Sequence, residues 1–240
     1  MRIMKPAEIE RESMRIIEQE LSARGIRIPA ENAAVVKRVI HTTADFDYAE
    51  NLVFTENAVT RACAYLRKSG ASLYPSGNSA AGHGDVDPDG PVIVTDTNMA
   101  KSGVSRPAMK KLGAECLCFM AEQFIAEEAK KRGVTRAVVS MEHALKQYPG
   151  AALAVGNAPT ALFAISEAIE QGARPALVVG VPVGFVNVVE SKERLLETCR
   201  MHGVPAIVAR GRKGGSTVAA AVLNALLYAA AEMAAPEKRM

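Results

Sequence analysis

From residue 91 onward, short uninterrupted apolar runs alternate with amphipathic helical segments, and this alternation limits the possible folds more than any other feature of the chain. A strand that is apolar along its whole length has to be covered on both faces, which is typical of a parallel sheet lying between helices. The sequence therefore predicts an α/β fold with a mostly parallel, five-stranded sheet. The strands are expected over residues 92–96, 115–120, 151–155, 176–181 and 206–209.

Helices are expected between these strands and after the last one. Segment 135–148 is ambiguous, because its run A-V-V-S-M alone is typical of a strand. We favour a helix there, since Thr135 can cap its N-terminus and the helical pattern continues from Glu142 to Lys146. The other helices of this region are expected over residues 121–132, 159–171, 191–202 and from Ser216 onward.

Residues 1–70, which precede the sheet, carry apolar side chains at helical spacing, with helices expected over 30–41 and 56–70 as well as at the start. Segment 72–90 is rich in Gly, Ser, Pro and Asp, and we expect it to form an exposed, mobile loop. With 240 residues, the chain is long enough for a single domain whose α/β core spans 91–240.

The formal net charge of +3 is mild, and there is no dense lysine tract interleaved with aromatic residues, so a nucleic-acid partner is not expected. A modest positive charge suits an acidic small molecule. The longest apolar run, 218–235, is mostly alanine and contains Asn224 and Glu232, which favours a buried helix over a membrane span. The charged N-terminal turns and four cysteines without metal-ligand spacing favour a reduced, cytoplasmic protein.

Ligands of parallel α/β sheets bind beyond the carboxyl ends of the strands, so the residues that follow each expected strand are the first candidates for a site. These segments are rich in glycine or small polar residues, and all but the third lead toward a helix N-terminus, whose free N–H groups favour anions. They are residues 95–99, 156–160, 180–184 and 210–216.

The run G211-R-K-G-G-S-T217 is similar to a phosphate-binding loop, but no Gly-Lys-Ser/Thr closes it, so an ATPase is not favoured. Two interpretations remain open. The loop could capture a carboxylate through backbone N–H groups together with Arg210, Arg212 or Lys213. It could equally be a tight turn whose glycines let a strand and a helix pack.

No metal site is expected. Asp85, Asp87 and Asp89, with Asp96 further on, imitate a calcium loop, but Pro88 and the lack of a bidentate glutamate argue against it. A solvated loop is the simpler interpretation.

His41 ends an apolar helical run and begins a polar cluster that includes Thr42, Asp45 and Asp47. An imidazole can both donate and accept a proton near physiological pH. Two interpretations are open: a structural histidine that interacts favourably with the helix dipole, and a catalytic acid. The residues around it assign no role to Asp45 and Asp47.

Six segments, taken in this order, resemble the precorrin-8X methylmutase family of cobalamin biosynthesis. As a set they are specific and cover nearly the whole chain, although each is weak alone. The main departure is loop 72–90, which we expect to be shorter in many relatives. The segments are S13-M-R-I-I, R38-V-I-H-T-T-A-D-F-D-Y48, T95-D-T-N-M-A-K-S-G-V-S-R106, G156-N-A-P-T-A-L-F163, P182-V-G-F-V-N-V-V-E-S-K192 and G211-R-K-G-G-S216.

The resemblance implies a three-layer α/β/α fold similar to flavodoxin and a homodimer with active sites near its interface. It also implies the reaction, in which a methyl group migrates from C-11 to C-12 of a carboxylate-rich tetrapyrrole and gives hydrogenobyrinate or its cobalt counterpart. The essential histidine falls on His41, and substrate contacts fall on Ser13 and Arg38, with Arg136 as a further contact. The remaining candidate contacts are Arg210, which directly precedes the last matched segment, and, within the matched segments, Thr42, Asp96, Arg106, Gly156, Asn157, Pro182, Gly184, Gly214 and Gly215.

The expected chemistry needs no cofactor, because a methyl shift within one molecule requires no redox group, nucleophile or metal ligand from the protein. A proton that His41 delivers to the conjugated ring would make the ring electron-poor and favour migration, and general acid catalysis contributes roughly 10²–10⁴-fold. A non-catalytic corrinoid-binding or carrier protein is the alternative. A flavodoxin-like nucleotide or flavin binder is less favoured, since the phosphate-binding signature is missing.

Overall fold

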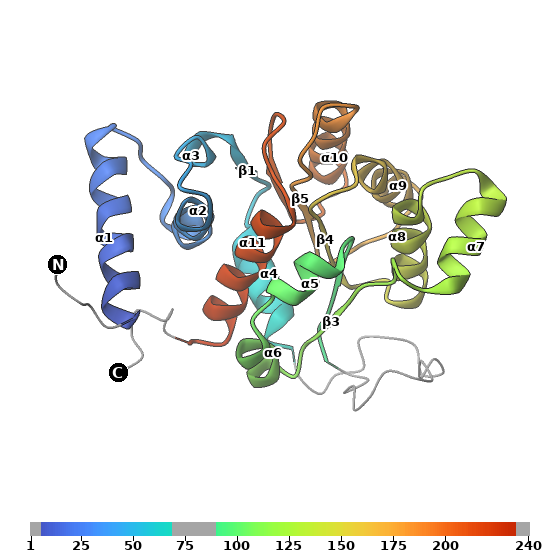
Figure 1. Ribbon diagram of the computed structural model, residues 1–240, viewed down its shortest axis with the longest axis horizontal. Helices are drawn as coiled ribbons and strands as arrows, with labels where there is room; N and C mark the ends of the chain where they lie inside the picture. The colour runs from blue at the N-terminus through green and yellow to red at the C-terminus, as the bar shows by residue number, and fades with distance from the viewer. Residues whose placement is uncertain (1–5, 69–89, 234–240) are drawn as a thin grey trace.

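The computed structural model describes residues 6–68 and 90–233, and in that part of the chain a six-stranded sheet lies between helices (Figure 1). The strand order is β1-β6-β5-β4-β2-β3. All neighbouring strands are parallel except β1 and β6, which are antiparallel. The strands are β1 (Leu52–Phe54), β2 (Val92–Thr95), β3 (Glu115–Leu117), β4 (Ala152–Val155), β5 (Leu177–Gly180) and β6 (Ala206–Ala209).

The central strands are apolar along their length because the sheet is covered on both faces. Every residue of β2, β4, β5 and β6 is buried. Successive side chains alternate between two hydrophobic clusters, so that Val179 and Ile207 belong to one and Val178 and Val208 to the other. The α/β fold and the parallel sheet expected from the sequence are therefore confirmed.

The expectation of five strands was wrong by one. The additional strand, β1, lies in the segment that was expected to be helical and pairs with β6, with Leu52 opposite Ala209. It is three residues long, too short for hydrophobic periodicity to reveal it. Its backbone partners come from a strand more than 150 residues later, so tertiary contacts and not local sequence determine it.

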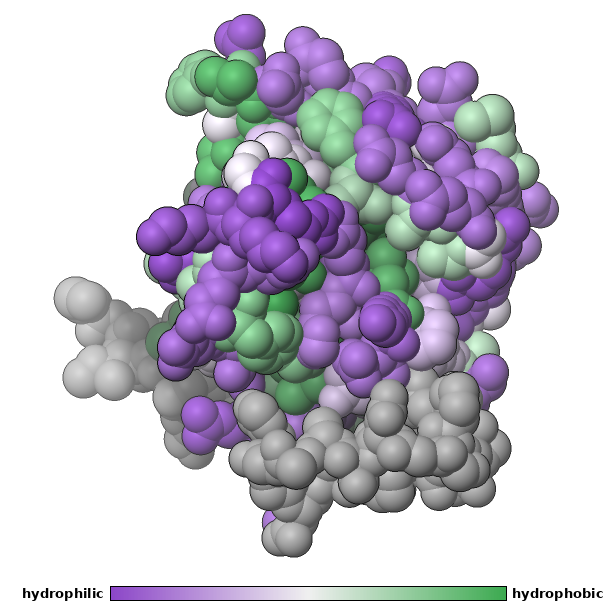
Figure 2. Space-filling model, turned by 90° about the vertical axis from the view of Figure 1, so that its right-hand side faces the viewer, coloured by the Kyte–Doolittle hydropathy of each residue, from purple (hydrophilic) through white to green (hydrophobic). Residues whose placement is uncertain are grey.

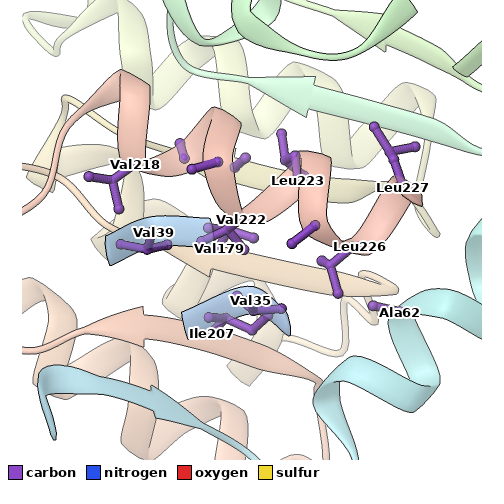
Figure 3. Close-up of a cluster of buried hydrophobic side chains, with 14 of the residues drawn as sticks. Val35, Val39, Ala62, Val179, Ile207, Val218, Val222, Leu223, Leu226 and Leu227 are labelled. Carbon is purple, nitrogen blue, oxygen red and sulfur yellow. The ribbon is translucent and has the colours of Figure 1, made fainter. Parts of the chain in front are cut away.

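One helical layer covers the face of the sheet that lies toward α1 and α2 in Figure 1. Its centre is α11, and Figure 3 shows Val222 of α11 and Val39 of α2 close to Val179 of the sheet, with Val35 of α2 close to Ile207. The N-terminal helices thus share one hydrophobic cluster with the sheet. The layer consists of α1 (Pro6–Ala23), α2 (Ala30–Thr43), α3 (Tyr48–Asn51), α4 (Ala58–Leu66), α5 (Asn98–Gly103), α6 (Arg106–Leu112) and α11 (Ser216–Ala230).

The other face is covered by α7 (Gln123–Arg132), α8 (Arg136–Gln147), α9 (Pro159–Glu170) and α10 (Val188–Met201). The ambiguous segment 135–148 is a helix, as favoured, and the Thr135 side chain accepts a hydrogen bond from the N–H of Val138 at its N-terminus. The exterior seen from the α7 and α8 side is mostly hydrophilic, with scattered apolar patches (Figure 2). The apolar sides of these helices therefore face the sheet.

Several helix boundaries differ from expectation. α5 and α6 follow β2 where no element was expected, and the side chains of Thr97 and Ser105 cap their N-termini. α10 begins at Val188, three residues before the expected start, so segment 180–184 also leads toward a helix. No helix in the described ranges is long and apolar enough to cross a membrane.

Candidate active site

Loops from four parallel strands meet at the carboxyl edge of the sheet. The Oγ1 atom of Thr97 lies 2.8 Å from the Oγ atom of Ser216, which joins the end of β2 to the start of α11. The N–H of Gly215 donates a hydrogen bond of 2.8 Å to the carbonyl of Val181. The loops that were expected to form a site are therefore in direct contact.

Asp96, at the end of β2, stabilises the loop that follows β4, residues 156–158. Its buried carboxylate accepts hydrogen bonds from the N–H groups of Gly156, Asn157 and Ala158, at 2.8, 2.8 and 2.9 Å. Burial raises the pKa of Asp96, and these hydrogen bonds act in the opposite direction. Because both oxygens are engaged and the residue is 0% exposed, its position favours a structural role over the expected substrate contact.

Two glycines allow the loops to approach so closely. A Cβ atom on Gly156 would lie 2.7 Å from the Cα atom of Ser216, and one on Gly214 would lie 2.1 Å from the carbonyl oxygen of Val181. Pro182, which follows Val181, is buried. At these positions the geometry favours the tight-turn interpretation of the glycine-rich loop.

The cations of the 210–215 loop have different partners. Arg210 forms a bidentate ion pair with Glu193, with distances of 2.7 and 2.8 Å. Arg212 is exposed and lies 5.6 Å from the ring centre of Phe185, with no carboxylate partner among the described residues. Of the cations proposed to capture a carboxylate, Arg212 is therefore the one that is ready to do so without losing an ion pair.

Lys213 links this loop to the polar cluster after His41. Its Nζ atom lies 2.6 Å from a carboxylate oxygen of Asp45 and 2.6 Å from one of Asp47. The ammonium of Lys213 lowers the pKa of Asp45, and the two carboxylates raise the pKa of Lys213. In Figure 1 the red loop between β6 and α11 rises between α3 and α10. Asp45 and Asp47, which had no assigned role, thus hold the end of α2 close to the sheet.

His41 lies in the last turn of α2, and its side chain is exposed. It forms no hydrogen bond or ion pair with another described residue. The next residue, Thr42, is also exposed, and its hydroxyl donates to the carbonyl of Arg38 at 2.9 Å. The imidazole is therefore accessible to a bound ligand.

Arg38 lies at the contact between α2 and α1, the helix that also carries Ser13. Arg38 pairs with Glu10 at 2.6 Å, and the two side chains are only 13% and 16% exposed. Its guanidinium also lies 5.6 Å from the ring centre of Tyr228. The hydroxyl of Ser13, one turn after Glu10, donates to the carbonyl of Ile9 at 2.9 Å. A substrate carboxylate that binds Arg38 would have to compete with Glu10.

Arg136 and Arg106 lie farther from His41. Arg136 is exposed at the start of α8, and the preceding Thr135 contacts Thr160 at 2.8 Å between their hydroxyl oxygens. This contact places Arg136 beside the loop that contains Asn157. Arg106 is the first residue of α6. The N–H of the preceding Ser105 donates a hydrogen bond to the side chain of Asn224, which lies more than two turns after the start of α11. The fold therefore does not bring Arg106 to the carboxyl edge.

Sequence reasoning missed the apolar part of this edge. Phe185 and Val186 are 81% and 78% exposed in the loop between β5 and α10, close to Gly184. The signal was present, since two large apolar residues sit in a loop that glycine and proline shape. It also missed Lys192, a buried cation on α10.

The described residues contain no group of three or more His, Cys, Asp or Glu side chains arranged to hold a metal ion. Asp85, Asp87 and Asp89 lie outside the described residues. The four cysteines Cys63, Cys116, Cys118 and Cys199 are free thiols.

Comparisons with known proteins point to one family. The family model of precorrin-8X methylmutase matches residues 8–74 and 86–229, and the interruption lies within loop 72–90. The cobalt-precorrin-8 methylmutase of Salmonella typhimurium is 41% identical over 196 residues, which cover 81% of this chain and 80% of the relative. The precorrin-8X methylmutase of Pseudomonas aeruginosa is 36% identical over 222 residues, which cover 91% and 93%.

A solved structure extends the similarity to the fold. The structure of the precorrin-8X methylmutase from Thermus thermophilus superposes with a TM-score of 0.75 at 36% sequence identity, and the match covers 93% of this chain and 98% of that one.

Proposed function

The chain belongs to the precorrin-8X methylmutase family, and from this premise we propose that His41 is the general acid of the reaction. The protein is an isomerase of cobalamin biosynthesis that moves a methyl group from C-11 to C-12 of a tetrapyrrole ring. One observation carries the assignment of His41. Its ring is exposed at the end of α2, and Lys213 joins that end to the carboxyl edge of the sheet through Asp45 and Asp47.

The chemistry requires a proton only for part of the cycle. An imidazolium at position 41 donates its proton to the conjugated ring, which becomes electron-poor and favours migration of the methyl group. Substrate and product are isomers, so the proton returns to the imidazole as the product forms. A histidine suits both steps, because an imidazole can both donate and accept a proton near physiological pH.

We propose that the carboxylates of the substrate are bound by cations near this histidine and along the carboxyl edge of the sheet. Arg212 and Arg136 are exposed and have no carboxylate partner among the described residues. Arg38 and Ser13 are proposed to contact the substrate near His41. Four further contacts are proposed because their residues are exposed or partly exposed: Thr42, Asn157, Gly184 and Arg210. Four more residues are proposed to act through the shape that they give the loops: Gly156, Pro182, Gly214 and Gly215.

Replacement of His41 by alanine tests the assignment. We expect turnover to be lost while the product hydrogenobyrinate still binds, because the ring donates a proton and is not needed to hold the macrocycle. The visible absorption spectrum during incubation with substrate reports turnover. A carrier protein would instead bind the product with no spectral change in added substrate, and near-normal turnover by His41→Ala would exclude the proposed acid.

The same assay, run once with metal-free and once with cobalt-containing substrate, shows which of the two the enzyme converts. Relatives with both names are similar to this chain over most of its length.

We further propose a cytoplasmic homodimer with each active site near the interface, built from a single domain. The exposed Phe185 and Val186 at the carboxyl edge support the interface, since contiguous apolar surface commonly marks contact sites. The free thiols support a reducing compartment. Light scattering of the wild type and of Phe185→Ser tests the dimer, which the substitution should weaken. A monomeric wild type would exclude it.

A further inference from the structure

Lys192 is a buried cation that the reaction scheme above does not use. It lies on α10, is 0% exposed and is the largest of the fully buried side chains among the described residues. A buried ammonium is costly unless its N–H groups find partners. Burial lowers the pKa of Lys192 to about 8, so the side chain still carries its charge at neutral pH. Such a residue needs a specific explanation.

The partners of Lys192 are backbone carbonyls of the 210–215 loop. Its Nζ atom donates hydrogen bonds of 2.8 Å to the carbonyl of Gly211 and of 2.8 Å to that of Lys213. The carbonyl between them, that of Arg212, accepts a hydrogen bond of 3.3 Å from the N–H of Gly184. Three consecutive carbonyls of the loop are therefore bound from the protein side.

This arrangement fixes which groups the loop presents to the outside. The side chain of Lys213 reaches Asp45 and Asp47 at 2.6 Å each. These carboxylates follow His41 by four and six residues in the sequence. A continuous set of contacts thus runs from the buried Lys192, through the loop backbone and Lys213, to the end of α2.

We propose that Lys192 is a positioning residue for the methyl migration: it holds the 210–215 loop in the shape that brings Lys213 to Asp45 and Asp47 and so fixes the position of His41. The inference rests on the proposed role of His41 as the general acid. It adds a residue that contacts neither substrate nor reacting atoms and acts through the loop and Lys213.

The variant Lys192→Met tests this role, since methionine fills a similar volume but has no donor for the two carbonyls. We expect kcat to fall by roughly 10- to 100-fold, because a small misplacement of a catalytic group has effects of this size. KM should change far less. Lys213→Met should also lower kcat. The double variant should have a kcat no lower than that of the more impaired single variant, because both lysines act on His41 through the same set of contacts.

A second readout does not depend on activity. The chain has four histidines, so the NMR signal of the His41 ring can be identified by its loss in His41→Gln. Lys192→Met and Lys213→Met should both shift or broaden that signal. Lys111→Met, the same change at an exposed site on α6, serves as the control and should leave the signal and kcat unchanged.

Two results would overturn the inference. One is a Lys192→Met enzyme whose folded fraction has wild-type kcat and an unchanged His41 signal, which would leave Lys192 with a purely structural role. The other is additive losses in the double variant. If Lys192→Met fails to fold, Lys213→Met decides alone, and an unchanged kcat and His41 signal in that variant would refute the route. If His41→Ala is active, the general-acid assignment fails, while the NMR shifts still show whether Lys192 positions this helix end.

Discussion

The Nζ atom of Lys213 lies 2.6 Å from the Oδ2 atom of Asp45, although 168 residues separate them in the sequence. This ion pair joins the loop after β6 to the segment that follows α2, the helix that carries His41. Asp47 binds the same ammonium at 2.6 Å. The end of α2 is thereby held at the edge where parallel sheets bind their ligands.

Replacement of both Asp45 and Asp47 by asparagine should lower kcat while changing the melting temperature little. The three side chains are partly exposed, and surface ion pairs add little to stability. Activity per folded enzyme, measured alongside the melting curve, checks this. A double variant with wild-type kcat would show that the link to Lys213 has no part in positioning His41.

The same ion pair should weaken in acid. Lys213 lowers the pKa of Asp45 below its ordinary value of 3.8, so the stabilisation is fully present above that value and is lost as pH falls through the lowered folded-state pKa. Titration of the Asp45 carboxyl by NMR should give a higher pKa in Lys213→Met than in the wild type. An identical pKa in both proteins would contradict the pairing.

Asp96→Asn should destabilise the fold by about 3 kcal/mol, because an amide replaces one acceptor oxygen by a donor and leaves a buried N–H of the 156–158 segment without a partner. Urea unfolding measures the change. Asp47→Asn is the matched control, as the same substitution at an exposed side chain should have little effect on stability. Equal stabilities of the two variants would refute the structural role of Asp96.

Gly156→Ala should cost roughly 1–3 kcal/mol of stability, because the added Cβ atom meets the backbone of Ser216, which cannot move without displacing α11. Gly150→Ala is the control, since nothing lies within 4 Å of its added Cβ atom. Thermal unfolding compares them, and a Gly156→Ala protein as stable as the control would show that the close contact is not needed.

The stability of the protein should depend on Lys192 at alkaline pH. Its folded-state pKa of about 8 lies below the ordinary 10.5, so between these values the unfolded chain holds a proton that the folded protein has released. Stability therefore rises with pH in this window, by up to about 3 kcal/mol from this group. The difference in unfolding free energy between wild type and Lys192→Met should rise from pH 8 to 10.5, and a constant difference would contradict the shifted pKa.

The sequence predicted the parts of this fold that rest on local patterns. The buried strands read as continuous apolar runs, and Thr135 marked the start of α8 because its side chain caps that helix. Strand β1 was not predicted, because it is only three residues long and its pairing partner, β6, lies far along the chain. The short helices α5 and α6 depend on the caps Thr97 and Ser105, which no hydrophobic period reveals.

The site was predicted unevenly for similar reasons. The loops at the carboxyl edge follow from the order of strands and helices, whereas the expected role of His41 rests on the resemblance to the family. The link between Lys213 and Asp45 depends on tertiary packing and has no local signature. Lys192 could have been noticed, because it occupies a position on the buried stripe of α10 between Val188 and Leu195, where an apolar residue is expected.

The most direct test of the central claim is turnover by His41→Ala, followed by the visible absorption spectrum of the corrinoid, with hydrogenobyrinate binding measured on the same preparation. A general acid at position 41 predicts binding close to that of the wild type and no detectable conversion of substrate. Conversion at a near wild-type rate would contradict it.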